Sequence, residues 1–267
     1  MDIDKTKFKA DPYNPRNKLI SANDIQDIMK NLDIHDLPIN NLALYQRAFV
    51  HKSYCEMKDY LEYSRSEECL PLFKVSYETL EFIGDSFLGN VIANYLYKRY
   101  FIAHNKDEGF LTKLKIRFVC GDQLAYLSDR LKMNQFMIIS KHIEEDCDGR
   151  MHSNILEDIL EAFIGAIYTD TGDFAMVEKF IVNMIEAHVD FSDVILHDNN
   201  YKDQILRYFQ HNYKVHPTYV SVKEDNMYRC DILREATVVA TGYGHSKKKS
   251  EQEASKRALI KFRVLSE

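Results

Sequence analysis

The sequence lacks any uninterrupted apolar run near the roughly eighteen residues that a membrane-spanning helix requires. Its first twenty residues, MDIDKTKFKADPYNPRNKLI, lack the apolar segment of a secretory signal. The five cysteines are odd in number and show no C-x-x-C spacing, which argues against a zinc site or a disulfide framework. We therefore expect no membrane association and a reducing intracellular compartment, either the cytoplasm or the nucleus.

The chain also lacks an overall positive charge, because its formal net charge is −6. From residue 199 onward, however, 13 Lys and Arg outnumber 8 Asp and Glu, giving +5. Residues 1–198 hold the remaining 22 basic and 33 acidic residues, giving −11. An acidic module followed by a basic one is typical of a protein whose C-terminal part contacts phosphates.

Length and apolar content suit one large and one small domain, without internal repeats. Residues 1–20 are polar and contain two prolines, which predicts a poorly ordered arm, and 191–199 is predicted to be a linker. Residues 55–76 break the helical pattern, and a long loop of this kind is often functional or disordered. Hydrophobic periodicity predicts helices over 22–32, 41–50, 77–101, 109–118, 121–131, 153–170 and 174–189.

The most informative feature is a pair of helical segments that combine carboxylates with large apolar side chains. In YETLEFIGD (77–85), Glu78, Glu81 and Asp85 lie at i, i+3 and i+7, on one side of a helix. In NILEDILEAFIGAIY (154–168), Asp158 and Glu161 lie at i and i+3. Like charges at this spacing repel one another. A divalent cation would offset the repulsion, and Mg²⁺ takes carboxylate oxygens as ligands.

Two other interpretations of these acids are open at this point. Carboxylates on a helix are often only its solvated face, but both segments become strongly apolar directly after the acids, which favours burial. A dimetal carboxylate bundle would need a Glu-x-x-His pair. The residue three after Glu78 is Glu81, and the residue three after Glu161 is Ile164, so this pair is absent and the bundle is disfavoured.

These segments resemble the ribonuclease III family. YETLEFIGDSFLGNVIANYLY is similar to its signature helix and LEDILEAFIGAIYTD to its second acidic helix. AFVHKSY (48–54) and DEGFLTKLK (107–115) look like its A-L-T-H-x-S-Y and E-G-x-L-(S/T)-x-L-(R/K) elements. The resemblance covers roughly 22–190 and implies an all-α nuclease domain, placed at 21–190, that dimerises through the signature helix. It also implies endonucleolytic hydrolysis of double-stranded RNA with Mg²⁺, or Mn²⁺ as a substitute, giving 5′-phosphate ends and short 3′ overhangs.

The resemblance also implies roles for individual acids. Two further family acids, which lie near the scissile strand, fall on Glu78 and Glu108. Glu157 departs from the family, which usually has Ala there, and adds a charge beside the site. Among the metal ligands, Asp85 and Glu161 are assigned as catalytic. The four metal-binding acids of the family fall on Glu81, Asp85, Asp158 and Glu161.

Two alternatives to this assignment are a protein that binds RNA without cutting it, and an enzyme that uses a histidine for catalysis. A protein that only sequesters double-stranded RNA would be favoured by the loss of one of the four metal-binding acids, and all four are carboxylates here. His51 in AFVHKSY could serve as a catalytic base, but we interpret it as a buried, hydrogen-bonded structural residue. We therefore favour the enzyme.

The last seventy residues change in character. YKDQILRYFQHNY predicts a helix, while YVSVKED, YRCDILRE and ATVVATGYG predict strands. A final amphipathic helix follows in HSKKKSEQEASKRALIKFRVL. This order resembles the double-stranded RNA-binding domain, α-β-β-β-α, placed at 200–267, so the whole chain is expected to be an α+β multidomain protein. By the similarity of GYGHSKKKSEQEAS to that family's motif, RNA contact is assigned to His245, Ser246, Lys247, Lys248 and Lys249.

A physical argument supports this assignment, and two departures limit it. Three lysines at 247–249 open a helix, where the helix dipole disfavours cations unless an anion is bound. Leu206 and Arg207 stand where the family usually has a Gln-Glu pair, and the first hairpin loop is only Glu224-Asp225-Asn226. We expect phosphate contact across the major groove and weakened readout of the minor groove.

Overall fold

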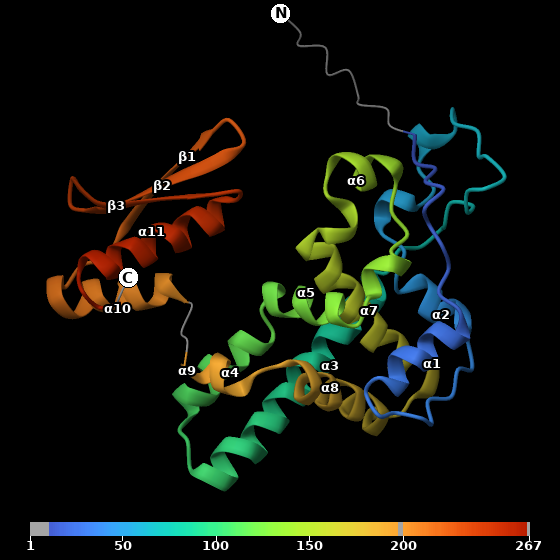
Figure 1. Cartoon of the computed structure of the whole chain (residues 1–267), viewed down its shortest axis with the longest axis horizontal. Helices are drawn as coiled ribbons and strands as arrows, with labels where there is room; N and C mark the ends of the chain where they lie inside the picture. Colours follow the sequence, from blue (N-terminus) through green and yellow to red (C-terminus); the bar gives the residue numbers. More distant parts are fainter. Residues whose placement is uncertain (1–10, 197–199, 266–267) are drawn as a thin grey trace, which may run out of the picture. The chain divides into compact units, whose positions relative to one another are not determined.

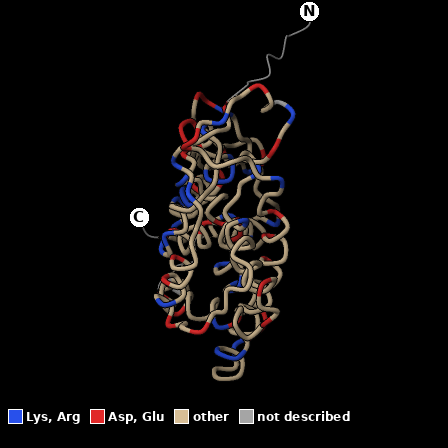
Figure 2. Tube along the Cα trace, turned by 90° about the vertical axis from the view of Figure 1, so that its right-hand side faces the viewer, with Lys and Arg blue, Asp and Glu red and all other residues tan. Residues whose placement is uncertain are grey.

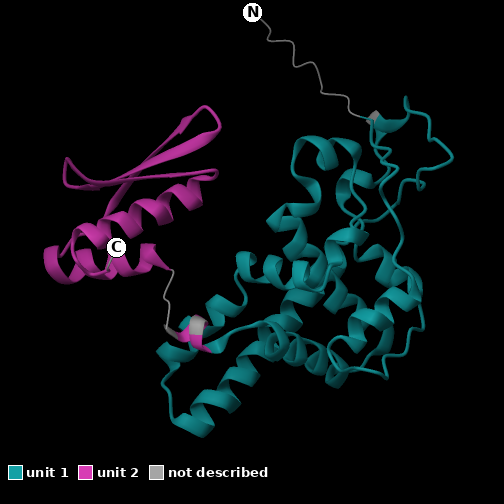
Figure 3. Cartoon of the chain, viewed as in Figure 1, with its two compact units in different colours: residues 1–191 teal, residues 192–267 magenta. Residues whose placement is uncertain are grey.

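The computed structural model describes residues 11–196 and 200–265. The chain forms two compact units, residues 1–191 and 192–267 (Figure 3). The first unit is helical, and the second combines helices with a three-stranded sheet (Figure 1). No helix in the described part of the chain is both long and apolar enough to cross a membrane. All five cysteines are free thiols.

The seven helices that the periodicity predicts are all present, within a few residues of their expected ends. Two short helices, α6 and α9, and several single turns were not predicted. The 3₁₀ turns are η1 (Lys52–Tyr54), η2 (Lys58–Tyr60), η4 (Met133–Phe136) and η5 (Gly149–Met151), and α3 continues into a π-helical segment, η3 (Tyr97–Ile102). The α-helices up to residue 196 are α1 (Ala22–Lys30), α2 (Leu42–Arg47), α3 (Glu78–Leu96), α4 (Glu108–Phe118), α5 (Gly121–Arg130), α6 (Lys141–Asp146), α7 (Ser153–Thr171), α8 (Phe174–His188) and α9 (Phe191–Leu196).

Helix α7 is the centre of the first unit. Every residue from Ile159 to Ile167 is buried, as in a helix enclosed by others, and Glu161 is the one charged residue among them. Helices α3, α5, α8 and α2 pack around it. It ends at Gly172, whose φ of 65° is the left-handed conformation that favours glycine after a helix.

The N-terminal segment differs from what we expected, and part of the predicted linker is helical. Residues 1–10 lie outside the described residues, but 11–20 are packed rather than poorly ordered. The side-chain amides of Asn14 and Asn17 donate hydrogen bonds to the Ile139 carbonyl at 3.2 and 2.9 Å, and Ile20 is buried. Helix α9 occupies the first six residues of the expected linker, and its remaining residues, 197–199, lie outside the described residues.

The segment 55–76 folds back onto the turn that precedes it. Cys55 and Phe73 form an isolated parallel β-bridge, and the Tyr54 hydroxyl donates to the Leu70 carbonyl at 2.9 Å. Leu70, Leu72 and Phe73 pack against the buried side chains of Val50, Tyr54 and Ile138. The insertion therefore covers a small apolar cluster beside η1.

The second unit has the predicted order of elements: α10 (Tyr201–Tyr213), β1 (Thr218–Glu224), β2 (Met227–Arg234), β3 (Thr237–Gly244) and α11 (Lys247–Lys261). The strands form an antiparallel sheet in the order β1-β2-β3. Its core joins Ile205 and Phe209 of α10 to Ile232 of β2 and Leu259 of α11. The α+β multidomain fold class, an all-α domain followed by an α-β-β-β-α domain, is thus confirmed.

Two glycines of β3 explain the G-x-G motif of this unit. A Cβ added to Gly242 would overlap the backbone of Ala254, and one added to Gly244 would lie 2.6 Å from the Ser250 nitrogen. Strand β3 and helix α11 therefore meet backbone to backbone, which requires small residues on both sides. This contact fixes the beginning of α11, where the three lysines stand.

Candidate active site

Helices α3 and α7 cross in direct backbone contact, and two glycines make this possible. A Cβ added to Gly84 would overlap the carbonyl of Glu161, and a Cβ added to Gly165 would overlap the carbonyl of Leu80. Any larger residue at either position would force the helices apart. The crossing lies where both helices carry their acids, so Glu81 and Asp85 of α3 are close enough to act on the charge of Glu161 of α7.

The acids on the two helices are close enough to repel one another. Glu161 is buried, with 8% of its surface exposed. Burial raises the pKa of Glu161 to about 8, and the charges of Asp85 and Glu157 contribute to this rise. The pKa of Glu81 rises to about 7, first because of burial and then because of Asp158 and Glu78. At neutral pH Glu161 is therefore mostly protonated and Glu81 is about half ionised unless a cation is bound.

Asp158 is held by a tyrosine. The buried Tyr77 hydroxyl donates a hydrogen bond to Asp158 Oδ2 at 2.6 Å. Burial raises the pKa of Asp158, while the Tyr77 hydrogen bond stabilises the carboxylate and opposes that rise. Tyr77 directly precedes α3, so it ties the start of this helix to α7 through an acid of the site.

Two further acids, Glu78 and Glu157, border the cluster. Glu78 is half-exposed, accepts a hydrogen bond from Ser76 Oγ at 3.2 Å and lies 3.6 Å from Lys52 Nζ. The carboxylate of Glu157 lies against Gly121, the first residue of α5, where a Cβ would lie 2.9 Å from Glu157 Cδ. The departure at 157 thus places a charge at the edge of the cluster, against the N-terminus of α5.

Glu108 is not brought to the other acids within one chain. It is exposed at the start of α4, where its side chain accepts from Thr112 Oγ1 at 2.7 Å. This end of α4 lies beside η3, the segment that continues α3, because Lys106 N donates to the Tyr100 carbonyl. Tyr100 follows Asp85 by fifteen residues of helix, a rise of roughly 20 Å. Its predicted place near the scissile strand stays a prediction.

The oxygen atoms of the four predicted ligands suit a hard divalent cation, although they do not converge on one position. Glu81, Asp85, Asp158 and Glu161 offer only carboxylate oxygens, the ligands that Mg²⁺ prefers. Among the described residues, no three side chains of His, Cys, Asp or Glu converge closely enough to hold an ion as they stand. The repulsion that keeps these carboxylates apart is also what a cation would relieve. The four acids therefore fit the group chemically and need rotations of their side chains to bind it.

His51 is hydrogen-bonded within its own turn, and it is half-buried rather than fully buried as we expected. Its Nδ1 accepts a hydrogen bond from the Ser53 backbone N–H at 3.2 Å and so caps η1, and it also lies 2.8 Å from Ser53 Oγ. Burial and the charge of Lys52 lower the pKa of His51 to about 4. The imidazole is therefore neutral at physiological pH, and its Nδ1 is engaged in hydrogen bonding within its own turn.

In the second unit the predicted RNA-contact residues share the beginning of α11. Ser246 is the N-cap, because its Oγ accepts from the Lys249 backbone N–H at 3.2 Å. His245 and the three lysines are exposed, and within the described residues none of the lysines forms an ion pair. Acidic and basic positions are interspersed along the chain trace (Figure 2), so the charge of each part is a balance of mixed signs.

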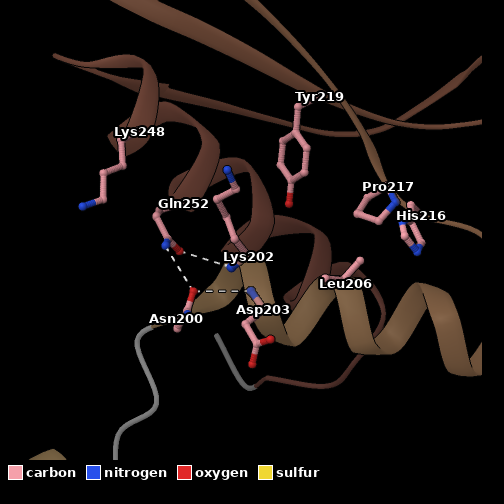
Figure 4. A pocket seen from close by; sticks show the side chains of 9 residues that line it. All are labelled: Asn200, Lys202, Asp203, Leu206, His216, Pro217, Tyr219, Lys248 and Gln252. Atoms are coloured by element: carbon pink, nitrogen blue, oxygen red, sulfur yellow. Dashed lines mark hydrogen bonds between the residues drawn. The ribbon is translucent and has the colours of Figure 1, made fainter. Parts of the chain in front are cut away.

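The two departures of this unit are visible in its geometry. Glu224 of β1 pairs with Met227 of β2, so a turn of only two residues joins the strands. Arg207, which stands where the family usually has a glutamate, forms an ion pair with Asp203 at 2.8 Å. Leu206 lines an open recess of about 580 Å³ between α10, the start of β1 and α11 (Figure 4). Lys248 stands at its edge, beside the other lining residues Asn200, Lys202, Asp203, His216, Pro217, Tyr219 and Gln252.

Sequence reasoning missed three residues that shape the cluster on α3 and α7. Gly84 and Gly165 each stand within an acidic segment, and a glycine in the middle of a strongly apolar helix is a signal for close packing. Tyr77 is the first residue of YETLEFIGD, but no local pattern shows that its hydroxyl reaches Asp158, 81 positions later.

Two family models match the chain, and they match separate parts of it. The model described as Ribonuclease-III-like matches residues 41–188, and the model described as double-stranded RNA binding motif matches 201–261. The first match spans more than half of the chain and contains the whole crossing of α3 and α7. The second contains α10, the sheet and α11.

Curated relatives match over most of the chain. A probable ribonuclease 3 of Acanthamoeba polyphaga mimivirus is 31% identical over 95% of this chain, which spans about half (48%) of that relative. Ribonuclease 3 of Borreliella afzelii is 31% identical over 88% of this chain and 90% of its own length. The solved nuclease domain of ribonuclease III from Campylobacter jejuni has a TM-score of 0.48 and 27% identity, covering 62% of this chain and 98% of that one. The chain therefore belongs to the ribonuclease III family of endoribonucleases and carries a C-terminal double-stranded RNA binding motif.

Proposed function

We propose that this chain is a homodimeric endoribonuclease that hydrolyses double-stranded RNA with a divalent metal, leaving 5′-phosphate ends and short 3′ overhangs. The observation that carries the proposal is the crossing of α3 and α7 at two glycines, which brings four carboxylates from two helices into mutual repulsion. A cluster of like charges that includes a buried acid and two half-buried ones is costly without a cation. The cluster lies within residues 41–188, the part of the chain that matches the nuclease family model, and this supports a catalytic role for it.

Glu81, Asp85, Asp158 and Glu161 would hold the metal, with Mg²⁺ as the expected ion and Mn²⁺ as a substitute. When bound, the ion supplies Lewis acidity at the phosphoryl group and activates water. Glu161 and Glu81 lose their protons on binding, because only their carboxylate forms are ligands. Tyr77 would orient Asp158 through its hydrogen bond to Oδ2.

The proposed dimer rests on an exposed apolar surface along α3 and η3. Phe82 of α3 is 76% exposed and Ile102 of η3 is 66% exposed, and the exposed rings of Tyr97 and Phe101 stack on one another in η3. Large apolar side chains exposed along one helix mark a surface that another protein covers. Two copies joined there would carry two active sites, one for each RNA strand, and staggered cuts would leave the short overhangs.

The second unit would add affinity through phosphates. Its exposed lysines at 247–249 stand at a helix N-terminus, where backbone N–H groups also favour anions. The two-residue β1–β2 turn leaves little to insert into a minor groove. We infer that the unit holds the backbone of double-stranded RNA and distinguishes its sequence poorly.

The direct test incubates the full chain with long double-stranded RNA in EDTA, Mg²⁺ or Mn²⁺, with single-stranded RNA and duplex DNA as matched controls. The proposal predicts short duplex products in Mg²⁺ and in Mn²⁺, and none in EDTA. Because each product should carry a 5′ phosphate, a kinase should label its 5′ end only after a phosphatase has removed that phosphate. Binding of the duplex without cutting in any metal would contradict it. That result would instead favour a protein that sequesters double-stranded RNA.

A further inference from the structure

A lysine stands at the edge of the carboxylate cluster, and none of the roles above uses it. Lys52 Nζ lies 3.6 Å from Glu78 Oε1. Its positive charge also lowers the pKa of Glu81 and of Asp158, against the effect of burial. The ammonium group therefore acts on acids of both α3 and α7.

The backbone that carries Lys52 is fixed from several sides. His51 caps its turn, and Ser53 beside it accepts two hydrogen bonds from elsewhere in the chain. Ser140 N donates to Ser53 Oγ at 3.0 Å, and the Tyr60 hydroxyl of the 55–76 insertion donates to the Ser53 carbonyl at 3.2 Å. The Lys52 side chain itself is 67% exposed. A flexible, accessible cation is thus mounted on a rigid turn beside the acids.

The ion pair with Glu78 does not by itself explain this arrangement. Both partners are more than half exposed, and ion pairs between exposed side chains contribute little to stability. Glu78 also keeps a hydrogen bond from Ser76 Oγ when Lys52 moves away. The ammonium can therefore exchange the Glu78 carboxylate for another anion at little cost.

An RNA strand needs such a contact at this place. The acids of α3 and α7 repel a phosphodiester backbone, and a cation at their rim offsets the repulsion where the strand enters. We propose that Lys52 binds a phosphate of the RNA strand beside the scissile phosphate and so positions that strand over the acids. The inference rests on the proposed function, because it takes double-stranded RNA as the substrate of this site.

The test compares Lys52→Gln and Lys52→Arg with the unaltered chain. Binding of a short RNA duplex is measured in Ca²⁺ at several salt concentrations, and single-turnover cleavage is measured in Mg²⁺. We expect Lys52→Gln to weaken binding roughly fivefold at about 0.15 M salt and to lower the log–log salt slope by about one, as removal of one phosphate contact does. Lys52→Arg should retain most of the affinity.

Matched variants separate this role from a structural one. Lys30 forms a comparable exposed pair with Asp27 at 3.8 Å on α1, so Lys30→Gln should change neither affinity nor slope. If Lys52 only neutralises Glu78, adding Glu78→Gln to Lys52→Gln will restore wild-type affinity, which would overturn the proposal. Unchanged affinity and slope in a correctly folded Lys52→Gln variant would overturn it as well. A wild-type chain that neither binds nor cuts duplex RNA would refute the proposed function instead.

Discussion

At the scale of single residues, Glu161 concentrates the electrostatic cost of the site. Its folded pKa of about 8 lies above the ordinary value of 4.5, so the folded chain holds this proton more tightly than the unfolded chain. The corresponding stability is fully present below pH 4.5 and is lost as the pH rises towards 8. A charged Glu161 therefore destabilises the metal-free fold at alkaline pH.

We predict that Glu161→Gln stabilises the metal-free protein at pH 8 by about 1–3 kcal/mol, because the amide cannot ionise. Thermal unfolding in EDTA at pH 8 and pH 5 measures this, and the difference between variant and wild type should shrink at pH 5. Mg²⁺ at pH 8 should raise the Tm of the wild type more than that of the variant. Equal stability at pH 8 would mean that Glu161 is not strained by its neighbours.

The sequence predicted which side chains would form the candidate site, and it could not predict the contacts that bring them together. Spacing of three and seven residues puts Glu78, Glu81 and Asp85 on one side of a helix, because helical geometry is local. The hydrogen bond from Tyr77 to Asp158 depends on how two helices cross, which no local pattern encodes. Lys52 is likewise brought to Glu78 by the tertiary fold alone.

At the scale of elements, the α3–α7 crossing depends on the absence of two Cβ atoms. We predict that Gly84→Ala destabilises the protein by about 1–3 kcal/mol, since the methyl group overlaps the Glu161 carbonyl, and that it lowers cleavage by separating the acids. Urea unfolding and single-turnover cleavage measure both effects.

Gly109→Ala is the matched control, because a Cβ at this exposed helical position meets nothing closer than 3.6 Å. It should leave stability unchanged or raise it by up to about 1 kcal/mol. If Gly84→Ala behaves like this control, the helices do not meet as closely as the crossing requires.

A second prediction at this scale concerns the beginning of α11. Lys247→Ala with Lys248→Ala should weaken duplex binding about equally across RNA sequences and flatten the salt slope by up to roughly one unit for each phosphate that is no longer bound. Titrations of two duplexes of different sequence at several salt concentrations measure this. Lys256→Ala, an exposed position on the same helix, is the control. Should the double variant match the wild type in affinity and slope, the unit does not clamp RNA through this turn.

Helices with an apolar stripe were predictable, and elements without one were not. Helix α6 (KHIEED) buries no residue, so it has no periodic signal. The packing of 11–20 depends on Asn14 and Asn17 reaching Ile139, more than 120 positions away. Helix α9 lies where VIL was too short an apolar run to distinguish a helix from a linker.

At the scale of the whole molecule, the exposed apolar surface of α3 and η3 predicts a dimer in the absence of RNA. Sedimentation equilibrium at micromolar concentration should give twice the chain mass of 31.4 kDa. Phe82→Asp should shift the protein towards monomers, because Phe82 is among the most exposed of the large apolar side chains. A monomeric wild type at these concentrations would contradict the dimer and the scheme of one cut per strand.

Our central claim is that carboxylates on α3 and α7 together carry metal-dependent cutting, separately from RNA binding. The most direct measurement is single-turnover cleavage of a defined RNA duplex in Mg²⁺ by Glu161→Gln, beside its duplex affinity in Ca²⁺. We predict that cleavage is lost, because a neutral amide is a poor ligand for a hard cation, while affinity stays at the wild-type level. Cleavage by Glu161→Gln at the wild-type rate would contradict the account.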